Sequence, residues 1–127
     1  MLRSFRRPRW WTGAWIAMIL GVIALSLMQG PPIPDWLVIA KFDHGFAYFC
    51  LATMAVQLYA GRFEWIASAL LLGTLGIALE YAQGFLTDYR DMSAYDGAID
   101  CVGVVIGLAT ARMPGVAWLQ KLDARLR

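Results

Sequence analysis

Four long runs of apolar residues alternate with short polar segments along the 127-residue chain. The runs cover residues 10–30, 44–61, 65–84 and 95–113. A membrane-spanning helix needs roughly 20 predominantly apolar residues, so each run has about the length of one span. The pattern predicts an all-α membrane protein in which residues 1–127 form a single domain, a bundle of four transmembrane helices.

Local signals indicate where these helices begin and end. Trp10, Trp11 and Trp15 are expected to form an interfacial belt at the start of the first helix. Asp35 or Asp43 could cap the second helix, and Pro114 ends the fourth. The remaining segment, GVAWLQKLDARLR, predicts a short amphipathic helix on the membrane surface. Its lipid-facing residues would be Val116, Leu119, Leu122 and Leu126.

The composition agrees with a membrane protein and argues against several other classes. Hydrophobic residues make up 60% of the chain, charged residues 16%, and the mean hydropathy is +0.56. With one histidine, and with Cys50 and Cys101 both inside apolar runs, we expect no zinc or other metal site and no cofactor. The sequence contains no nucleotide-binding loop, and the spread of its basic residues gives no indication of nucleic-acid binding.

The distribution of charge predicts the orientation. With the N-terminus in the cytoplasm, nine of the eleven Lys and Arg residues fall inside and seven of the nine acids fall outside. The positive-inside rule therefore predicts that both termini are cytoplasmic. The basic segment RSFRRPR before an apolar run also resembles a cleaved signal peptide, but the length of that run favours a retained helix.

Polar residues of three predicted helices fall at one height. With a rise of about 1.5 Å per residue, Glu80 lies about 24 Å above Glu64, His44 about 27 Å above Arg62, and Asp96 about 24 Å above Arg112. Asp100 follows Asp96 one turn deeper, and Gln83 lies one turn outward from Glu80. The same face of the fourth helix continues through Gly103 and Gly107, a GxxxG-like surface that lets another helix approach. The polar site is therefore expected to face the bundle.

Ionisable groups at this depth cost about 2.5 to 3.5 kcal/mol by insertion scales, so the acids need partners or protonation. We expect Arg90 to fold back over the carboxylates and His44 to exchange a proton with Glu80. The candidate ligand-binding residues share this outer polar region: Lys41, His44, Glu80, Gln83, Arg90, Asp96 and Asp100. The candidate acid and base groups among them are Glu80, His44, Asp96 and Asp100.

Several of these residues also have local explanations. Ser93 and Asp96 fit a capping box, which would explain Asp96 without any chemistry. Lys41 could extend its ammonium group to the membrane interface. Gln83, Tyr48 and Tyr95 could form interhelical hydrogen bonds or an aromatic belt. Glu80 and Asp100 favour a site most strongly, because neither is predicted to cap a helix.

Three segments together resemble the VanZ-like family of small bacterial membrane proteins. They are KFDHGFAY at 41–48, LEYAQ at 79–83 and RDMSAYDGAIDCVGVVIG at 90–107. Two positions depart from the family pattern: Ala40 stands where an acid usually precedes the lysine, and Asp100 stands where the family has asparagine. The resemblance implies a multi-pass protein of the bacterial inner membrane with its site toward the external face. The family takes its name from a protein linked to resistance to the glycopeptide teicoplanin.

Three functions fit these observations. The first is a cell-envelope protein whose outer pocket binds a membrane lipid or a lipid-linked envelope precursor, with an effect on teicoplanin susceptibility. The second is an intramembrane acid/base enzyme acting on such a precursor. The third is a proton or ion pathway, which the lack of ionisable groups in the inner halves of the spans disfavours. Gly13 and Gly21 in the first helix favour a homodimer.

Overall fold

The structure is a computed structural model that describes residues 1–28, 39–86 and 93–126, with the side chains of 39–42 excluded. This part of the chain is helical, and its only β-type contact is an isolated bridge between Leu2 and Tyr59. The helical elements in chain order are α1 (Pro8–Leu27), α2 (Ile39–Leu58), α3 (Arg62–Leu86), α4 (Ala94–Ala109), the 3-10 turn η1 (Thr110–Arg112) and α5 (Trp118–Arg125).

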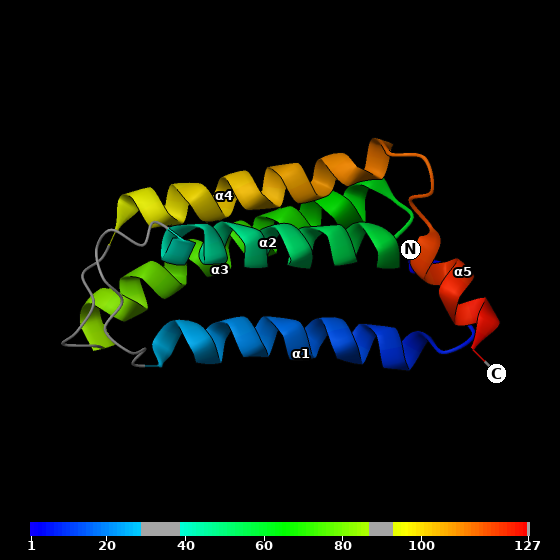
Figure 1. Cartoon of the computed structure of the whole chain (residues 1–127), viewed down its shortest axis with the longest axis horizontal. Coiled ribbons are helices and arrows are strands. Elements are labelled where there is room, and N and C mark those ends of the chain that lie inside the picture. The colour runs from blue at the N-terminus through cyan, green and yellow to red at the C-terminus, as the bar shows by residue number, and fades with distance from the viewer. Residues whose placement is uncertain (29–38, 87–92, 127) are drawn as a thin grey trace.

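Four long helices lie side by side along the long axis of the molecule, and α5 crosses one end of them (Figure 1). Helix α2 lies between α1 and α4, with α3 behind it. Most of the hydrophobic core comes from α2, including Tyr48, Leu51 and Ala55, each 1% exposed or less. Trp15 joins α1 to this core by donating its indole N–H to the Leu51 carbonyl at 2.9 Å.

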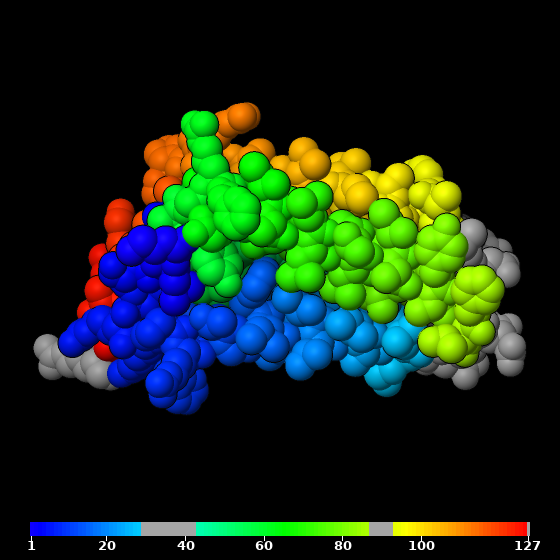
Figure 2. All heavy atoms as spheres, turned by 180° about the vertical axis from the view of Figure 1, so that it is seen from behind, coloured from blue at the N-terminus to red at the C-terminus, as the bar shows by residue number. Residues whose placement is uncertain are grey.

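Three of the described helices are long and apolar enough to cross a membrane: α1, α3, and α4 continued through η1 to Arg112. The opposite face of the molecule presents these three helices next to one another, in the order α1, α3, α4 (Figure 2). Large apolar side chains of α3 and α4 are exposed, among them Phe63, Leu70, Ile77 and Val105. Side chains of this kind suit a surface in contact with lipid.

Glycines allow α2 and α4 to pack in direct backbone contact. A Cβ atom at Gly103 would lie 2.1 Å from the carbonyl oxygen of Gly45, and one at Gly107 would lie 2.6 Å from the carbonyl oxygen of Phe49. The predicted close approach along this face of α4 is confirmed. A Cβ atom added at Gly13 or Gly21 of α1 would meet no other atom of the described residues within 4 Å, and the homodimer stays a prediction.

The two ends of the bundle differ in charge. The basic end contains the start of α1, the end of α2, the start of α3, η1 and α5, and both described chain ends lie there (Figure 1). It holds every Lys and Arg whose side chain the structure describes: Arg3, Arg6, Arg7, Arg9, Arg62, Arg112, Lys121 and Arg125. The opposite end, here called the acidic end, contains His44, Glu80, Ser93 and Asp96.

Helix α5 packs across the basic end of the bundle. The buried Asp123 carboxylate accepts hydrogen bonds from the backbone N–H of Arg6 and, at 2.8 Å, from the indole N–H of Trp11. The backbone N–H of Leu119 donates to Gln57 of α2 at 3.4 Å. Burial raises the pKa of Asp123, but the hydrogen bonds from Trp11 and the backbone outweigh it and hold that pKa below its usual value.

This closure corrects the prediction for the C-terminal segment. The predicted helix is present, but Leu119 is only 2% exposed and packs in the core of the bundle. Leu122 and Leu126 are about two-fifths exposed. The amphipathic pattern cannot distinguish a lipid surface from a protein surface, because both accept the same apolar side chains.

The helix ends also differ from the predicted ones. Helix α2 begins at Ile39, five residues before the predicted start. Its first turns contain Lys41 and Asp43, and charged residues of this kind can continue a helix beyond the apolar run that predicts it. Asp43 therefore lies inside α2 and does not cap it, and Asp35 falls outside the described residues. Helix α3 is longer at both ends than predicted, and α4 ends at Ala109 with the turn η1 continuing it.

Candidate functional site

Three side chains from three helices converge near the acidic end. His44 comes from α2, Glu80 from α3 and Asp100 from α4. One nitrogen or carboxylate oxygen of each lies within 4.8 Å of those of the other two. Glu80 and Asp100 are 6% and 2% exposed, while His44 is half-buried. His44 and Glu80, which the sequence placed at one height, thus lie together inside the bundle, but the third member is Asp100, which was expected one turn deeper, and not Asp96. These three residues are called here the His–Glu–Asp cluster.

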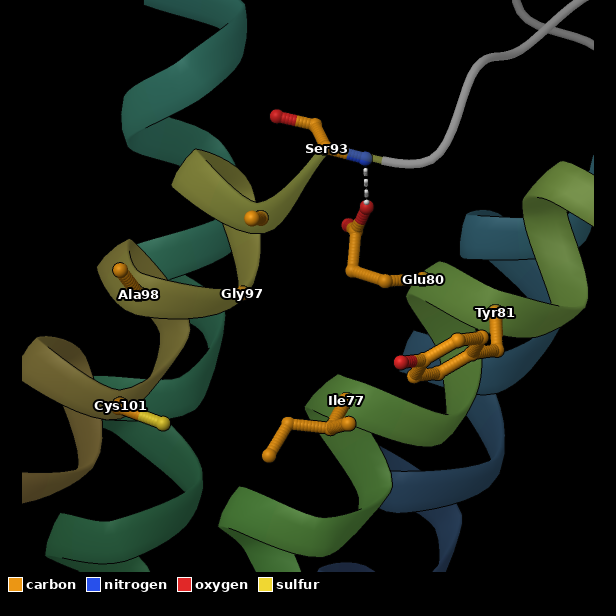
Figure 3. Close-up of a pocket in the computed structure, with 8 residues that line it drawn as sticks. Ile77, Glu80, Tyr81, Ser93, Gly97, Ala98 and Cys101 are labelled. Carbon is orange, nitrogen blue, oxygen red and sulfur yellow. Dashed lines mark hydrogen bonds between the residues drawn. The ribbon is translucent and has the colours of Figure 1, made fainter.

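Glu80 also has a structural role. Its Oε2 atom accepts a hydrogen bond at 3.0 Å from the backbone N–H of Ser93, the residue that caps α4 (Figure 3). The prediction that Glu80 caps no helix is therefore wrong, because it satisfies a free N–H at the start of a different helix. A pattern within one helix cannot reveal such a contact.

The predicted capping box at Ser93 holds in part. The Ser93 hydroxyl accepts a hydrogen bond from the backbone N–H of Asp96 at 3.2 Å, which confirms Ser93 as the N-cap. The return bond expected from Asp96 is made by Glu80 instead. The Oδ1 atom of Asp96 is buried without a hydrogen-bond partner among the described residues. Asp96 lies one turn outward from Asp100.

Two buried oxygen atoms beside the cluster lack hydrogen-bond partners within the described part of the chain. They are Oδ1 of Asp100 and the hydroxyl of Tyr48, whose side chains are 2% and 1% exposed. Both side chains lie against Gly76 of α3, where an added Cβ would be 3.2 Å from Asp100 Oδ2 and 3.4 Å from Tyr48 Cζ. Tyr48 is therefore a core residue and not part of an aromatic belt.

Gly76 is a site-forming residue that the sequence reasoning missed. It lies four residues before Glu80, on the buried face of α3 that also carries Leu72, Leu79 and Gln83. A small residue one turn before a buried acid was the available signal, since i and i+4 share a helix face.

Gln83 connects the site to α1. Its side-chain amide donates to the carbonyl oxygen of Ser26 at 2.8 Å, between buried residues. This is the interhelical hydrogen bond that was one of its two predicted roles. Tyr95 is 65% exposed, as expected for a residue of an aromatic belt.

Two predicted site residues cannot be placed. Arg90 falls outside the described residues, and the Lys41 side chain is likewise not described, although its backbone lies in the first turn of α2. Their contacts with the carboxylates stay predictions.

A groove of about 330 Å³ opens between α3 and α4 beside the cluster. Ile77 and Tyr81 project from α3 and Cys101 from α4, while Glu80 and Ser93 supply its polar end (Figure 3). Its walls are mainly apolar, and Ile77 and Tyr81 are each about half exposed. The groove therefore offers one polar end and an apolar flank open to the outside of the bundle.

A second cavity, of about 240 Å³, lies on the other side of the cluster, between α1 and α2. Asp43, His44 and Tyr48 line it together with Val22, Leu25, Ser26 and Ala47. Asp43 is exposed, so this cavity connects the half-buried His44 and the buried Tyr48 with the surface.

Comparison of the chain with protein-family models, with curated proteins and with solved structures found no match in any of the three. The VanZ-like resemblance therefore stays a prediction from the sequence.

Proposed function

We propose that this chain is a cell-envelope membrane protein that binds an amphiphilic ligand, a lipid or lipid-linked envelope precursor, in the groove between α3 and α4. The observation that carries this proposal is the chemistry of the groove. It ends in the Glu80 carboxylate and the N-terminus of α4, while its walls are apolar and open outward. A ligand with a polar headgroup and an apolar chain satisfies both parts.

The proposal includes four spans with the basic end in the cytoplasm. Helix α2 has 20 residues and a length of about 30 Å, which matches the hydrocarbon thickness of a bilayer. Its buried polar side chains Tyr48 and Gln57 turn toward the other helices, which supports the placement of this less apolar helix inside a bundle. The gathering of basic side chains at one end favours a cytoplasmic position for that end.

The sequence resemblance to the VanZ-like family supports an envelope role in bacteria. With the basic end inside, the groove opens in the outer half of the inner membrane, where lipid-linked wall intermediates are exposed. Arg90, in the segment before α4, would then hold an anionic headgroup over the carboxylates. Cells that express the protein would then differ in teicoplanin susceptibility from cells that lack it. If filling the groove abolishes this difference, the groove is connected with the phenotype.

Native mass spectrometry of the detergent-purified protein tests the proposal. Ala98→Trp fills the groove without changing charge, because Ala98 is exposed and lines it. Ile106→Trp is the matched control: it lies on the same helix two turns further on, is 54% exposed and does not line the groove.

We expect wild type and Ile106→Trp to retain a specific amphiphile that Ala98→Trp loses. Arg90→Ala should lose a phosphorylated ligand selectively. If all four proteins carry the same bulk lipids in the same amounts, the groove selects no ligand and the proposal fails.

A second candidate, an intramembrane acid/base enzyme, is favoured by the convergence of His44 with Glu80 and Asp100. A histidine next to two carboxylates can transfer a proton at neutral pH. The His44→Gln variant distinguishes the two candidate functions, because it should leave amphiphile binding intact. If wild type converts the retained ligand to a product and His44→Gln does not, the second candidate, an enzyme, is correct.

A further inference from the structure

The His–Glu–Asp cluster has a donor set that suits a metal ion. It offers one imidazole nitrogen and two carboxylates from three different helices, with the ligand atoms within 4.8 Å of one another. Imidazole and carboxylate together are typical ligands of zinc and related divalent transition metals. Three protein ligands with a further open position are the usual arrangement of catalytic zinc sites.

The unpartnered atoms give an independent reason to expect a ligand there. Asp100 Oδ1 and the Tyr48 hydroxyl are buried and have no hydrogen-bond partner among the described residues. Buried polar atoms are almost always paired, and an orphaned one indicates strain, a functional role, or a missing water or ion. The two side chains lie together over Gly76, where any larger residue would meet them.

The balance of charge points the same way. Two carboxylates lie close together inside the bundle, whereas all the Lys and Arg side chains that the structure describes lie at the opposite end. Like charges repel strongly in a medium of low dielectric constant. A divalent cation between them would be the largest local charge and would neutralise both.

We propose that His44, Glu80 and Asp100 bind one divalent transition-metal ion, Zn²⁺ being the best fit, with the Tyr48 hydroxyl beside the open position. Two ligand atoms that are each about 2.1 Å from a tetrahedral zinc are about 3.4 Å apart. Since the ligand atoms lie within 4.8 Å of one another, they need to approach each other by at most about 1.4 Å on binding. The hydrogen bond from Ser93 already orients the Glu80 carboxylate, as such bonds orient metal ligands elsewhere.

The cavity between α1 and α2 supplies a route for the ion. It leads from the exposed Asp43 to His44 and Tyr48. This proposal is the opposite of the sequence-based expectation of no metal site, which counted one histidine and no usable cysteine and did not consider two buried carboxylates beside that histidine. It is also independent of the proposed amphiphile, because the ligands face the bundle and binding can be measured without any lipid. If both proposals hold, Glu80 borders both sites and the ion would attract an anionic headgroup.

The test uses the full-length protein in detergent, without a polyhistidine tag, stripped of metal with a chelator. Equilibrium dialysis against Zn²⁺, followed by elemental mass spectrometry, gives the bound metal per chain. The variants are His44→Gln and Asp100→Asn, which keep side-chain size and polarity. Asp43→Asn is the matched control, because it removes an exposed carboxylate next to His44 that is outside the cluster.

We expect about one Zn²⁺ per chain for wild type and for Asp43→Asn. Loss of even an outer hydrogen-bond partner weakens metal affinity by 10- to 100-fold, so loss of a ligand should cost about 100-fold or more. Zinc should raise the Tm of wild type and leave that of His44→Gln unchanged.

A second readout needs no variant. Co²⁺ added to stripped wild type should give the intense visible absorption of a four- or five-coordinate site, and one equivalent of Zn²⁺ should abolish it. Wild type that binds no more zinc than His44→Gln, or a Co²⁺ spectrum of the hexa-aquo ion, would overturn the proposal. The acids would then be kept in the bundle by protonation.

Discussion

The two ends of the bundle treat a buried acid in opposite ways. At the basic end, Asp123 accepts hydrogen bonds from Arg6 and Trp11 and ties α5 to the start of α1. At the acidic end, Asp100 is equally buried, but its Oδ1 atom has no hydrogen-bond partner among the described residues. A fully paired acid belongs to the fold, whereas an unpaired one needs another explanation. The comparison teaches that burial alone does not identify a site, and that a buried oxygen atom without a hydrogen-bond partner is the better indication.

The packing of α2 on α4 joins the two ends, so breaking it should give the largest effect. Gly103→Ala places a Cβ against the backbone of Gly45, which cannot move away like a side chain. Overpacking of this kind should lower the free energy of unfolding by about 3 kcal/mol or more. Denaturant unfolding in detergent measures it. Gly73→Ala is the control, since a Cβ added there would meet no other atom of the described residues within 4 Å. An equal loss there would contradict the packing account.

Glu80 combines both kinds of role, and two substitutions separate them. Glu80→Ala leaves the Ser93 N–H without its acceptor and should cost about 2 kcal/mol. Glu80→Gln keeps an acceptor oxygen, so its stability should stay within about 0.5 kcal/mol of wild type while ligand binding falls. Chemical unfolding and native mass spectrometry of the same samples check both parts. Equal destabilisation by the two changes would show that the charge itself holds the fold.

The cap of α4 is a smaller contribution at the acidic end. Ser93→Ala removes the acceptor for the Asp96 N–H and should cost about 1 kcal/mol. Ser93→Asn, which preserves an N-cap oxygen, should recover most of that loss. Chemical denaturation of the three proteins in one detergent decides it. A stability of Ser93→Ala equal to that of wild type would mean that solvent replaces this cap.

The smallest effect concerns the pH dependence at the basic end. The pKa of Asp123 is lower in the folded state than its ordinary value of 3.8. A group with a lowered pKa stabilises the fold at every pH above the pKa that it has in the unfolded state. This stabilisation is lost as the pH falls through the pKa of the folded state. Asp123→Asn should therefore lower the Tm at pH 7, and the difference from wild type should shrink below about pH 4. A difference independent of pH would place the effect in packing.

The sequence predicted the elements better than their contacts. Apolar runs of span length indicated the four long helices, because each helix must hide its backbone polar groups from lipid by itself. The rise per residue was enough to bring His44 and Glu80 to one height, but it placed Asp96 there and Asp100 one turn deeper, whereas Asp100 is the residue that joins them. Gly103 and Gly107 correctly marked a close helix contact, because a GxxxG-like pattern acts through backbone proximity.

Contacts between distant segments could not be predicted in this way. The bond from Ser93 to Glu80 and the bonds from Arg6 and Trp11 to Asp123 join residues of separate elements. The same limit explains Leu119, whose apolar character fits lipid and protein equally well. The charged residues Lys41 and Asp43 delayed the predicted start of α2 to His44, because a span was expected to begin after the last charge, whereas the helix begins at Ile39.

The most direct test compares the two buried acids in one experiment. Asp100→Asn and Asp123→Asn are made in the same chain, and thermal unfolding is measured at pH 7 in a metal chelator. With the membrane placement proposed above, a charged carboxylate at this depth costs about 2.5 to 3.5 kcal/mol. Neutralising Asp100, whose Oδ1 has no partner among the described residues, should therefore recover about 1 to 2 kcal/mol and raise the Tm. Asp123→Asn should lower the Tm. If Asp100→Asn lowers the Tm as much as Asp123→Asn, the acidic end is part of the fold and not a ligand site.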